Sequence, residues 1–110
     1  MVIKTATPEL IQEMVDRIVR DFNPVKVILF GSQARGDAGP DSDVDLLVVM
    51  DDGLESVAEA EIGIAGCLAG MGVAKDIVVT TPAEIARFGH VVNTIVHSAR
   101  REGRTMYERR

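Results

Sequence analysis

The sequence has few cysteine and aromatic residues: one Cys (Cys67), no Trp and 4 % aromatic residues among 110. A single cysteine excludes an internal disulfide framework and is typical of a reducing compartment. With so few aromatic side chains, the core must be built from aliphatic residues. The 46 % hydrophobic share is nevertheless ordinary for a globular protein and indicates a folded chain rather than a disordered one.

Basic residues are also in the minority. Twelve Lys and Arg stand against 17 Asp and Glu, which gives a formal net charge of −5. A protein that binds nucleic acid directly needs a basic face to neutralise phosphates, so no direct nucleic-acid partner is expected. The charge is uneven, because nine acids and no Lys or Arg lie between residues 36 and 74, whereas five arginines follow from residue 100 onward. Most of these charges are expected to form solvated surface.

Long apolar runs are missing as well. The uncharged stretch 63–74 is too short to span a bilayer, which takes about 20 apolar residues. The first residues contain no apolar run that could serve as a signal peptide. These features predict a soluble, cytoplasmic protein without a membrane partner. The length predicts a single domain over 1–110, and its thin core would gain from a partner, so a homo-oligomer is one option.

The spacing of apolar residues predicts helices that alternate with three strands. The first helix is expected to open at Thr7-Pro8 and to end at Asn23-Pro24, and Thr81 with Glu84 forms a capping box. Residues 104–110 are expected to form a basic tail. The prediction is an α/β fold with a small mixed sheet of about three strands and flanking helices. The expected strands are 25–30, 44–50 and 73–80, and the other expected helices are 55–69 and 90–102.

Asp43 and Asp45 stand two residues apart at the entry of the expected strand 44–50. Because side chains alternate along a strand, both carboxylates point to the same face. Like charges this close repel each other, and an adjacent cation would relieve the repulsion. Mg²⁺ prefers oxygen ligands and commonly shares them with substrate phosphates, so the pair is a candidate metal site. An isolated Asp-x-Asp is more often a hydrated loop end, so the assignment needs a second feature.

That second feature is a Gly31-Ser32 turn at the end of the expected strand 25–30, after which residues 33–35 can begin a short helix. A strand–turn–helix presents backbone N–H groups that suit a phosphate, although most such turns have no ligand. If strands 25–30 and 44–50 are antiparallel neighbours, the turn and the Asp pair meet at one edge of the sheet. One Mg²⁺-triphosphate would then bridge them.

Together these residues resemble a known signature. Gly31-Ser32-Gln33-Ala34-Arg35-Gly36, with ten residues between Ser32 and Asp43, and then Ser42-Asp43-Val44-Asp45-Leu46-Leu47 resemble the motif of the DNA polymerase β-like nucleotidyltransferase superfamily. The short length and the segment 102–107 are similar to those of minimal nucleotidyltransferases. Members of that group are often encoded beside HEPN-domain proteins in toxin–antitoxin pairs. The resemblance covers roughly residues 25–80.

The resemblance implies a polymerase-β-like nucleotidyltransferase domain with three carboxylates. Asp43 and Asp45 would hold two Mg²⁺ ions. The third carboxylate lies on a later strand, where Asp76 is the only acid of 73–80; it would bind the second ion and accept or orient the hydroxyl proton. A parallel third strand would begin at the same end of the sheet as Asp43. Taken alone, Asp76 would suit an ion pair with a nearby basic side chain.

The remaining implied contacts concern the nucleotide. Gly31 and Ser32 would hold the β- and γ-phosphates of ATP or another NTP. Arg35 would either add positive charge at these phosphates or form an outward ion pair. The sequence shows no acceptor site, so the acceptor hydroxyl is expected from another molecule.

Two classes of function follow. The first is a Mg²⁺-dependent nucleotidyltransferase that transfers a nucleoside monophosphate, expected to be AMP from ATP, to a hydroxyl of a HEPN partner as the antitoxin of the pair. The second is a non-catalytic binding module that neutralises a HEPN partner by contact. All three acids are in place, which favours the enzyme.

Overall fold

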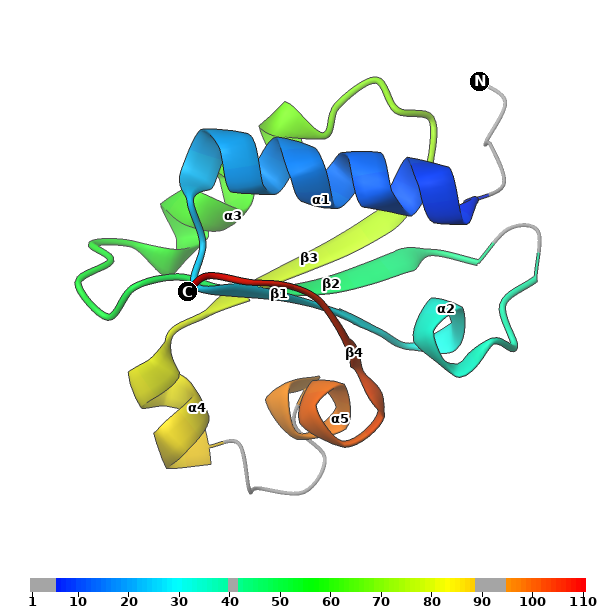
Figure 1. The fold of residues 1–110 in the computed structure, drawn as a ribbon. Coiled ribbons are helices and arrows are strands. Elements are labelled where there is room, and N and C mark those ends of the chain that lie inside the picture. The colour runs from blue at the N-terminus through cyan, green and yellow to red at the C-terminus, as the bar shows by residue number, and fades with distance from the viewer. Residues whose placement is uncertain (1–5, 40–41, 89–94) are drawn as a thin grey trace.

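The computed structural model describes residues 6–39, 42–88 and 95–110. A four-stranded sheet lies between two layers of helices, with α1 and α3 on one face and α4 and α5 on the other (Figure 1). The elements in chain order are α1 (Pro8–Phe22), β1 (Lys26–Phe30), α2 (Ser32–Arg35), β2 (Val44–Val49), α3 (Val57–Cys67), β3 (Lys75–Thr80), α4 (Pro82–Phe88), α5 (Ile95–Glu102) and β4 (Arg104–Glu108).

The sheet is mixed, as the sequence predicted, with the strand order β3-β2-β1-β4. Strand β1 runs antiparallel to both β2 and β4. Strand β3 runs parallel to β2, which it reaches through the crossover helix α3. The parallel connection places the first residues of β2 and β3 at the same edge of the sheet, next to the last residues of β1.

Helix α1 forms where the capping residues and the apolar spacing predicted it. Thr7 Oγ1 accepts a hydrogen bond from Leu10 N at 3.1 Å, and Pro8 occupies the first helical position. The helix ends at Asn23, whose φ of 47° is left-handed. One face is buried on the sheet through Ile11, Met14, Val15 and Ile18.

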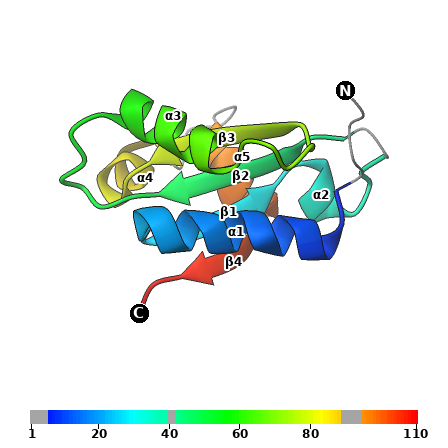
Figure 2. The ribbon, with the colours of Figure 1, turned by 90° about the horizontal axis from the view of Figure 1, so that it is seen from above.

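Helix α3 lies beside α1 on the same face of the sheet, as the view from above shows (Figure 2). Gly63, which weakens the sequence signal for this helix, is a contact point. A Cβ at Gly63 would lie 3.2 Å from two ring carbons of Phe22 on α1. The missing side chain therefore lets the two helices approach closely.

The core is centred on β2, four of whose residues are fully buried. Val44, Leu46 and Val48 belong to the larger apolar cluster under α1 and α3. Leu47 points to the opposite face, where it joins Ile28 of β1 and Ala99 of α5. Both faces of β2 are therefore covered, which explains its nearly continuous apolar sequence.

Strand β4 corrects one expectation, because residues 104–110 do not form a tail. Arg104–Glu108 pairs with β1 as the edge strand, so the sheet has four strands and not three. Its residues are exposed or half-buried, and its charges hide the alternation that marks a strand. Arg109 Nη2 also bonds Asp51 Oδ1 at 2.5 Å, which ties this segment to the turn after β2.

The boundaries of the other elements agree with the predictions within a few residues. The expected helix 90–102 is described from Ile95 onward, and residues 90–94 lie outside the described part. Residues 40 and 41 of the expected loop before β2 lie outside it too. No helix among the described residues is long and apolar enough to cross a membrane.

Candidate active site

The register of three neighbouring strands brings the sequence-predicted residues into one row. Phe30, the last residue of β1, pairs with Asp45 of β2, and Asp45 pairs with Asp76 of β3. Gly31 directly follows Phe30, so the turn, the Asp pair and the third carboxylate meet at one edge. The expected antiparallel and parallel pairings that this required are both present.

The three carboxylates lie on the sheet face that α5 covers. Leu46 faces α1 and α3, and because side chains alternate along a strand, the adjacent Asp45 points to the opposite side of the sheet. Asp43 has the same parity as Asp45, and Asp76 has that of Val78, which packs in the cluster with Ala99. Asp43 and Asp76 are exposed, and Asp45 is half-buried between them.

Both the backbone conformation at position 31 and the neighbouring Asp45 side chain require a glycine there. Its φ of 73° is left-handed, a conformation that residues with a side chain rarely adopt. A Cβ at this position would overlap the Oδ2 atom of Asp45. The glycine therefore keeps open the space directly above the central carboxylate.

Helix α2 begins at Ser32 immediately after this glycine. The backbone N–H groups of Ala34 and Arg35 donate to Gly31 O at 3.1 Å, so the turn closes on itself. Gln33 Nε2 donates to Ser42 O at 3.4 Å and thus ties α2 to the residue before Asp43. Ser32 is half-buried at this junction.

The electrostatics of the edge are those of crowded like charges. Burial raises the pKa of Asp45 above its ordinary value, and the carboxylates of Asp76 and Asp43 raise it further. The Arg35 guanidinium acts in the opposite direction and is the weaker influence. A cation at this position would be stabilised by the same carboxylates that now repel one another.

Arg35 takes part in two ion pairs in this structure. Its Nε lies 3.2 Å from Asp37 Oδ2, and its Nη1 lies 3.3 Å from Glu102 Oε1 at the end of α5. The two alternatives for Arg35 were a contact with the phosphates and an outward ion pair, and in this structure the side chain forms outward ion pairs. The sequence did not identify Glu102 as a neighbour, since 67 residues separate it from Arg35 and no local pattern links them.

The donor chemistry of the edge suits Mg²⁺, which takes carboxylate oxygens together with water and phosphate oxygens. Asp43, Asp45 and Asp76 are the residues that would supply them. Within 6–39, 42–88 and 95–110, no three His, Cys, Asp or Glu side chains are placed to hold an ion by themselves. Bound Mg²⁺ would therefore need oxygens from water and from the nucleotide as well.

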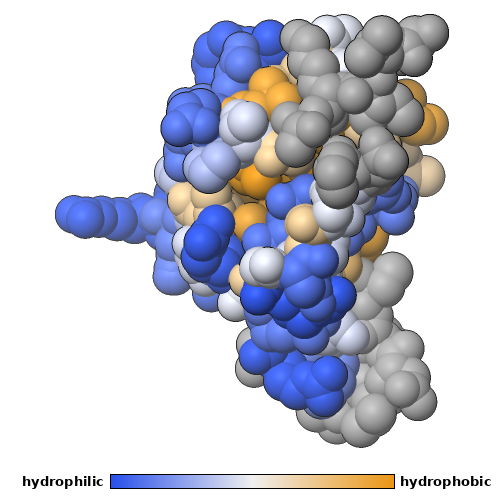
Figure 3. All heavy atoms as spheres, turned by 90° about the vertical axis from the view of Figure 1, so that its right-hand side faces the viewer, coloured by the Kyte–Doolittle hydropathy of each residue, from blue (hydrophilic) through white to orange (hydrophobic). Residues whose placement is uncertain are grey.

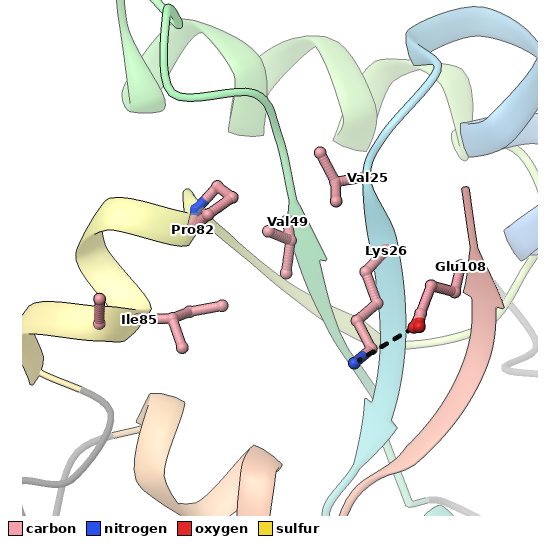
Figure 4. Close-up of a pocket in the computed structure, with 7 residues that line it drawn as sticks. Val25, Lys26, Val49, Pro82, Ile85 and Glu108 are labelled. Atoms are coloured by element: carbon pink, nitrogen blue, oxygen red, sulfur yellow. Dashed lines mark ion pairs between the residues drawn. The ribbon is translucent and has the colours of Figure 1, made fainter. Parts of the chain in front are cut away.

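The end of the molecule at which α2 lies has a mainly hydrophilic surface with a small apolar area (Figure 3). By contrast, an apolar pocket of about 360 Å³ lies at the opposite end of the sheet, where β1 begins and β2 ends (Figure 4). Val25, Val49 and Ile85 line it, and the ion pair between Lys26 Nζ and Glu108 Oε2 (3.7 Å) borders it. It contains no part of the carboxylate row, so it is not the candidate active site.

A mixed α/β sheet with this topology, a Gly-Ser turn and clustered carboxylates defines the polymerase-β-like nucleotidyltransferase class of fold. The family model described as a nucleotidyltransferase domain matches residues 11–101 of this chain. The chain therefore belongs to the nucleotidyltransferase domain family, which confirms the resemblance seen in the sequence. No curated protein matches the chain.

Two solved structures share the fold. A Sulfolobus solfataricus protein provisionally assigned as a nucleotidyltransferase is 24 % identical, with a TM-score of 0.63 over 92 % of this chain and 79 % of that one. A toxin–antitoxin structure solved with AMP-PNP is 21 % identical, with a TM-score of 0.55 over 90 % of this chain and 74 % of that one. At these identities the likeness concerns the fold alone.

Proposed function

We propose that this protein transfers AMP from ATP to a hydroxyl group of a partner protein, as the antitoxin of a toxin–antitoxin pair with a HEPN-domain protein. The observation that carries the proposal is the row from Gly31 through Asp45 to Asp76 in a chain of the nucleotidyltransferase family. The toxin–antitoxin neighbour, which was solved with AMP-PNP, supports the choice of an adenine nucleotide and of a protein partner.

In the proposed reaction the oxygen of the acceptor hydroxyl attacks the α-phosphorus of ATP. A new oxygen–phosphorus bond forms, the bond to the β-phosphate bridge breaks, and pyrophosphate leaves with that electron pair. Mg²⁺ held by Asp43, Asp45 and Asp76 would neutralise phosphate charge and lower the pKa of the attacking hydroxyl. Gly31 and Ser32 bind and orient the β- and γ-phosphates, and the Asp76 carboxylate accepts the hydroxyl proton.

The exposure of the site supports an acceptor on another molecule. Asp43 and Asp76 are exposed, and the acidic segment that contains Asp43 would attract a basic partner and speed its encounter. A macromolecular hydroxyl, such as that of a tyrosine side chain, can approach such an edge from solvent.

The test is to incubate the purified protein and its HEPN partner with Mg²⁺ and each α-labelled NTP, and then to measure the partner's intact mass. The expected result is label from ATP alone and a mass increase of AMP units that is absent with Asp43→Asn/Asp45→Asn. Tight association without any change in mass would favour the alternative of a non-catalytic module that neutralises its partner by contact.

A further inference from the structure

Strand β3 forms an edge of the described sheet, since β2 is its only neighbour there. Ala74 O accepts from Val44 N at 2.9 Å, and Thr80 O accepts from Met50 N at 2.8 Å. The even-numbered residues of this stretch therefore direct their backbone groups toward β2. Backbone groups alternate along a strand, so the odd-numbered residues between them direct theirs outward.

A groove of about 560 Å³ runs along this edge, between β3 and the outer side of α3. Ile62 and Ala65 of α3 line it together with Ala69 of the turn after α3, and Val73 and Ile77 line it from the strand side. Six of its eight lining residues are apolar, and the other two are Glu61 and Lys75.

The composition of α3 indicates that this outer side is covered. Helix α1 is amphipathic, with charged residues between its buried positions, as expected for a helix with one face in water. Helix α3 has apolar residues on both sides: Ile64 is fully buried, whereas Ile62 and Ala65 are exposed. Among the described residues, Ile62 and Val57 are the exposed large hydrophobic side chains, and Ile62, at 73 % exposed, is the one that lines the groove.

The two charged residues of the groove, Glu61 and Lys75, indicate what kind of surface can bind there. Glu61 Oε1 accepts a hydrogen bond from Val79 N, an outward-facing group of β3, at 3.2 Å. Lys75 lies four residues earlier on the same strand and on the same face, with its Nζ donating to Val73 O at 3.2 Å. The edge thus has a positive end at Lys75 and a negative end at Glu61 beside Val79. The two ends lie two residues before and two residues after Ile77, so a two-fold rotation about Ile77 exchanges them.

We propose that a second copy of this chain occupies the groove, with its β3 antiparallel to this β3 and Ile77 at the two-fold axis. Antiparallel pairing about Ile77 places Lys75 opposite Val79 of the second copy. Val79 N then donates to Lys75 O of the second copy in place of Glu61 Oε1, and the Glu61 carboxylate that this exchange releases lies beside that copy's Lys75. Each Lys75 then meets a Glu61, as a two-fold interface between identical surfaces requires. Ile62 of each copy is buried between the two α3 helices.

The dimer leaves the carboxylate edge accessible, because Asp76 lies on the opposite face of β3 from the groove. The two chains would form one continuous sheet of eight strands.

The first test measures the mass of the full chain by sedimentation equilibrium over a range of concentrations. Wild type is expected to be a dimer, and Ile62→Asp is expected to be a monomer with an unchanged circular dichroism spectrum, since the replaced side chain is exposed. Val57→Asp is the matched control, because Val57 is an exposed aliphatic residue on the same helix that does not line the groove. It should remain dimeric.

The second test exchanges the charges. Lys75→Glu is expected to raise the dimer dissociation constant at least about tenfold. The double variant Glu61→Lys/Lys75→Glu is expected to bring that constant most of the way back to the wild-type value. A monomeric wild type, or a dimer that Ile62→Asp leaves intact, would overturn the proposal. A monomer in which Ile62→Asp removes binding of a different protein would overturn it too and would assign the groove to that protein.

Discussion

The beginning and the interior of strand β2 lie a few residues apart and have opposite physical roles. At the beginning, burial and then the neighbouring carboxylates raise the pKa of Asp45, because a charged carboxylate is costly there without a cation. In the interior, Leu46 and Val48 are fully buried in the main apolar cluster. The interior stabilises the fold, whereas the beginning reduces stability to keep negative charge at the sheet edge. Substitutions in the two regions should therefore affect different measurements.

The largest effect is expected from Asp43→Asn/Asp45→Asn. Loss of both carboxylates should lower the rate of the proposed AMP transfer at least about a thousandfold, within the range seen for positioned catalytic groups. The free energy of unfolding should stay the same or rise, since like charges are removed. Initial rates and urea unfolding measure the two quantities. Glu55 is an exposed acid beyond the other end of β2, so Glu55→Gln is the control and should change neither the rate nor the free energy of unfolding. A loss of activity in Glu55→Gln would contradict the assignment of Asp43 and Asp45 as the catalytic carboxylates.

Leu46→Ala should have the reverse effect. Removing a fully buried side chain should lower the free energy of unfolding by about 2–5 kcal/mol. The folded fraction should bind Mg²⁺-ATP with nearly wild-type affinity, measured by calorimetry below the unfolding transition. As a control, Val57→Ala at an exposed site should change the free energy of unfolding by no more than about 0.5 kcal/mol. A Leu46→Ala variant as stable as wild type would show that the strand interior does not carry the stability assigned to it.

Asp76→Asn should separate catalysis from binding at the carboxylate edge itself. The variant is expected to lose transfer about a hundredfold, the scale of a positioned base, and to bind Mg²⁺-ATP nearly as wild type does. Single-turnover rates and calorimetry distinguish the two effects. Full transfer activity would show that Asp76 has a structural role only.

The smallest effect concerns the pH dependence of stability. The pKa of Asp45 is raised on folding, so the folded protein holds this proton more tightly than the unfolded chain. Its favourable contribution is present below the ordinary value of 3.8 and is lost as the pH rises through the raised pKa. Asp45→Asn should therefore reduce the fall in stability above about pH 4, as measured by urea unfolding. Equal pH slopes for wild type and Asp45→Asn would contradict the prediction.

Much of the site was predictable because its signals are local. The Gly31-Ser32 turn and the Asp43–Asp45 pair are short patterns that lie together within residues 31–45. The apolar spacing of α1, its Thr7 cap and the alternation of β2 are equally local. The roles assigned to these residues in metal and nucleotide binding stay predictions until the variants are measured.

Other features depended on residues far apart in the chain. Strand β4 carries charges at its exposed positions, and its pairing with β1 decides that it is a strand. The ion pair of Arg35 with Glu102 and the groove beside Ile62 likewise join segments that no sequence period connects. Exposure of Ile62 could be recognised only once the opposite side of α3 was seen to be buried.

The sequence by itself determined α1, α3 and the strands β1, β2 and β3, and it determined which residues carry the candidate chemistry, because backbone preferences and side-chain alternation act over a few residues. Only the tertiary structure decided that Asp76 pairs with Asp45, that Gly31 leaves room above that carboxylate, and that β3 lies at an edge of the described sheet. These depend on strand register and order, which are set when distant apolar faces are buried together.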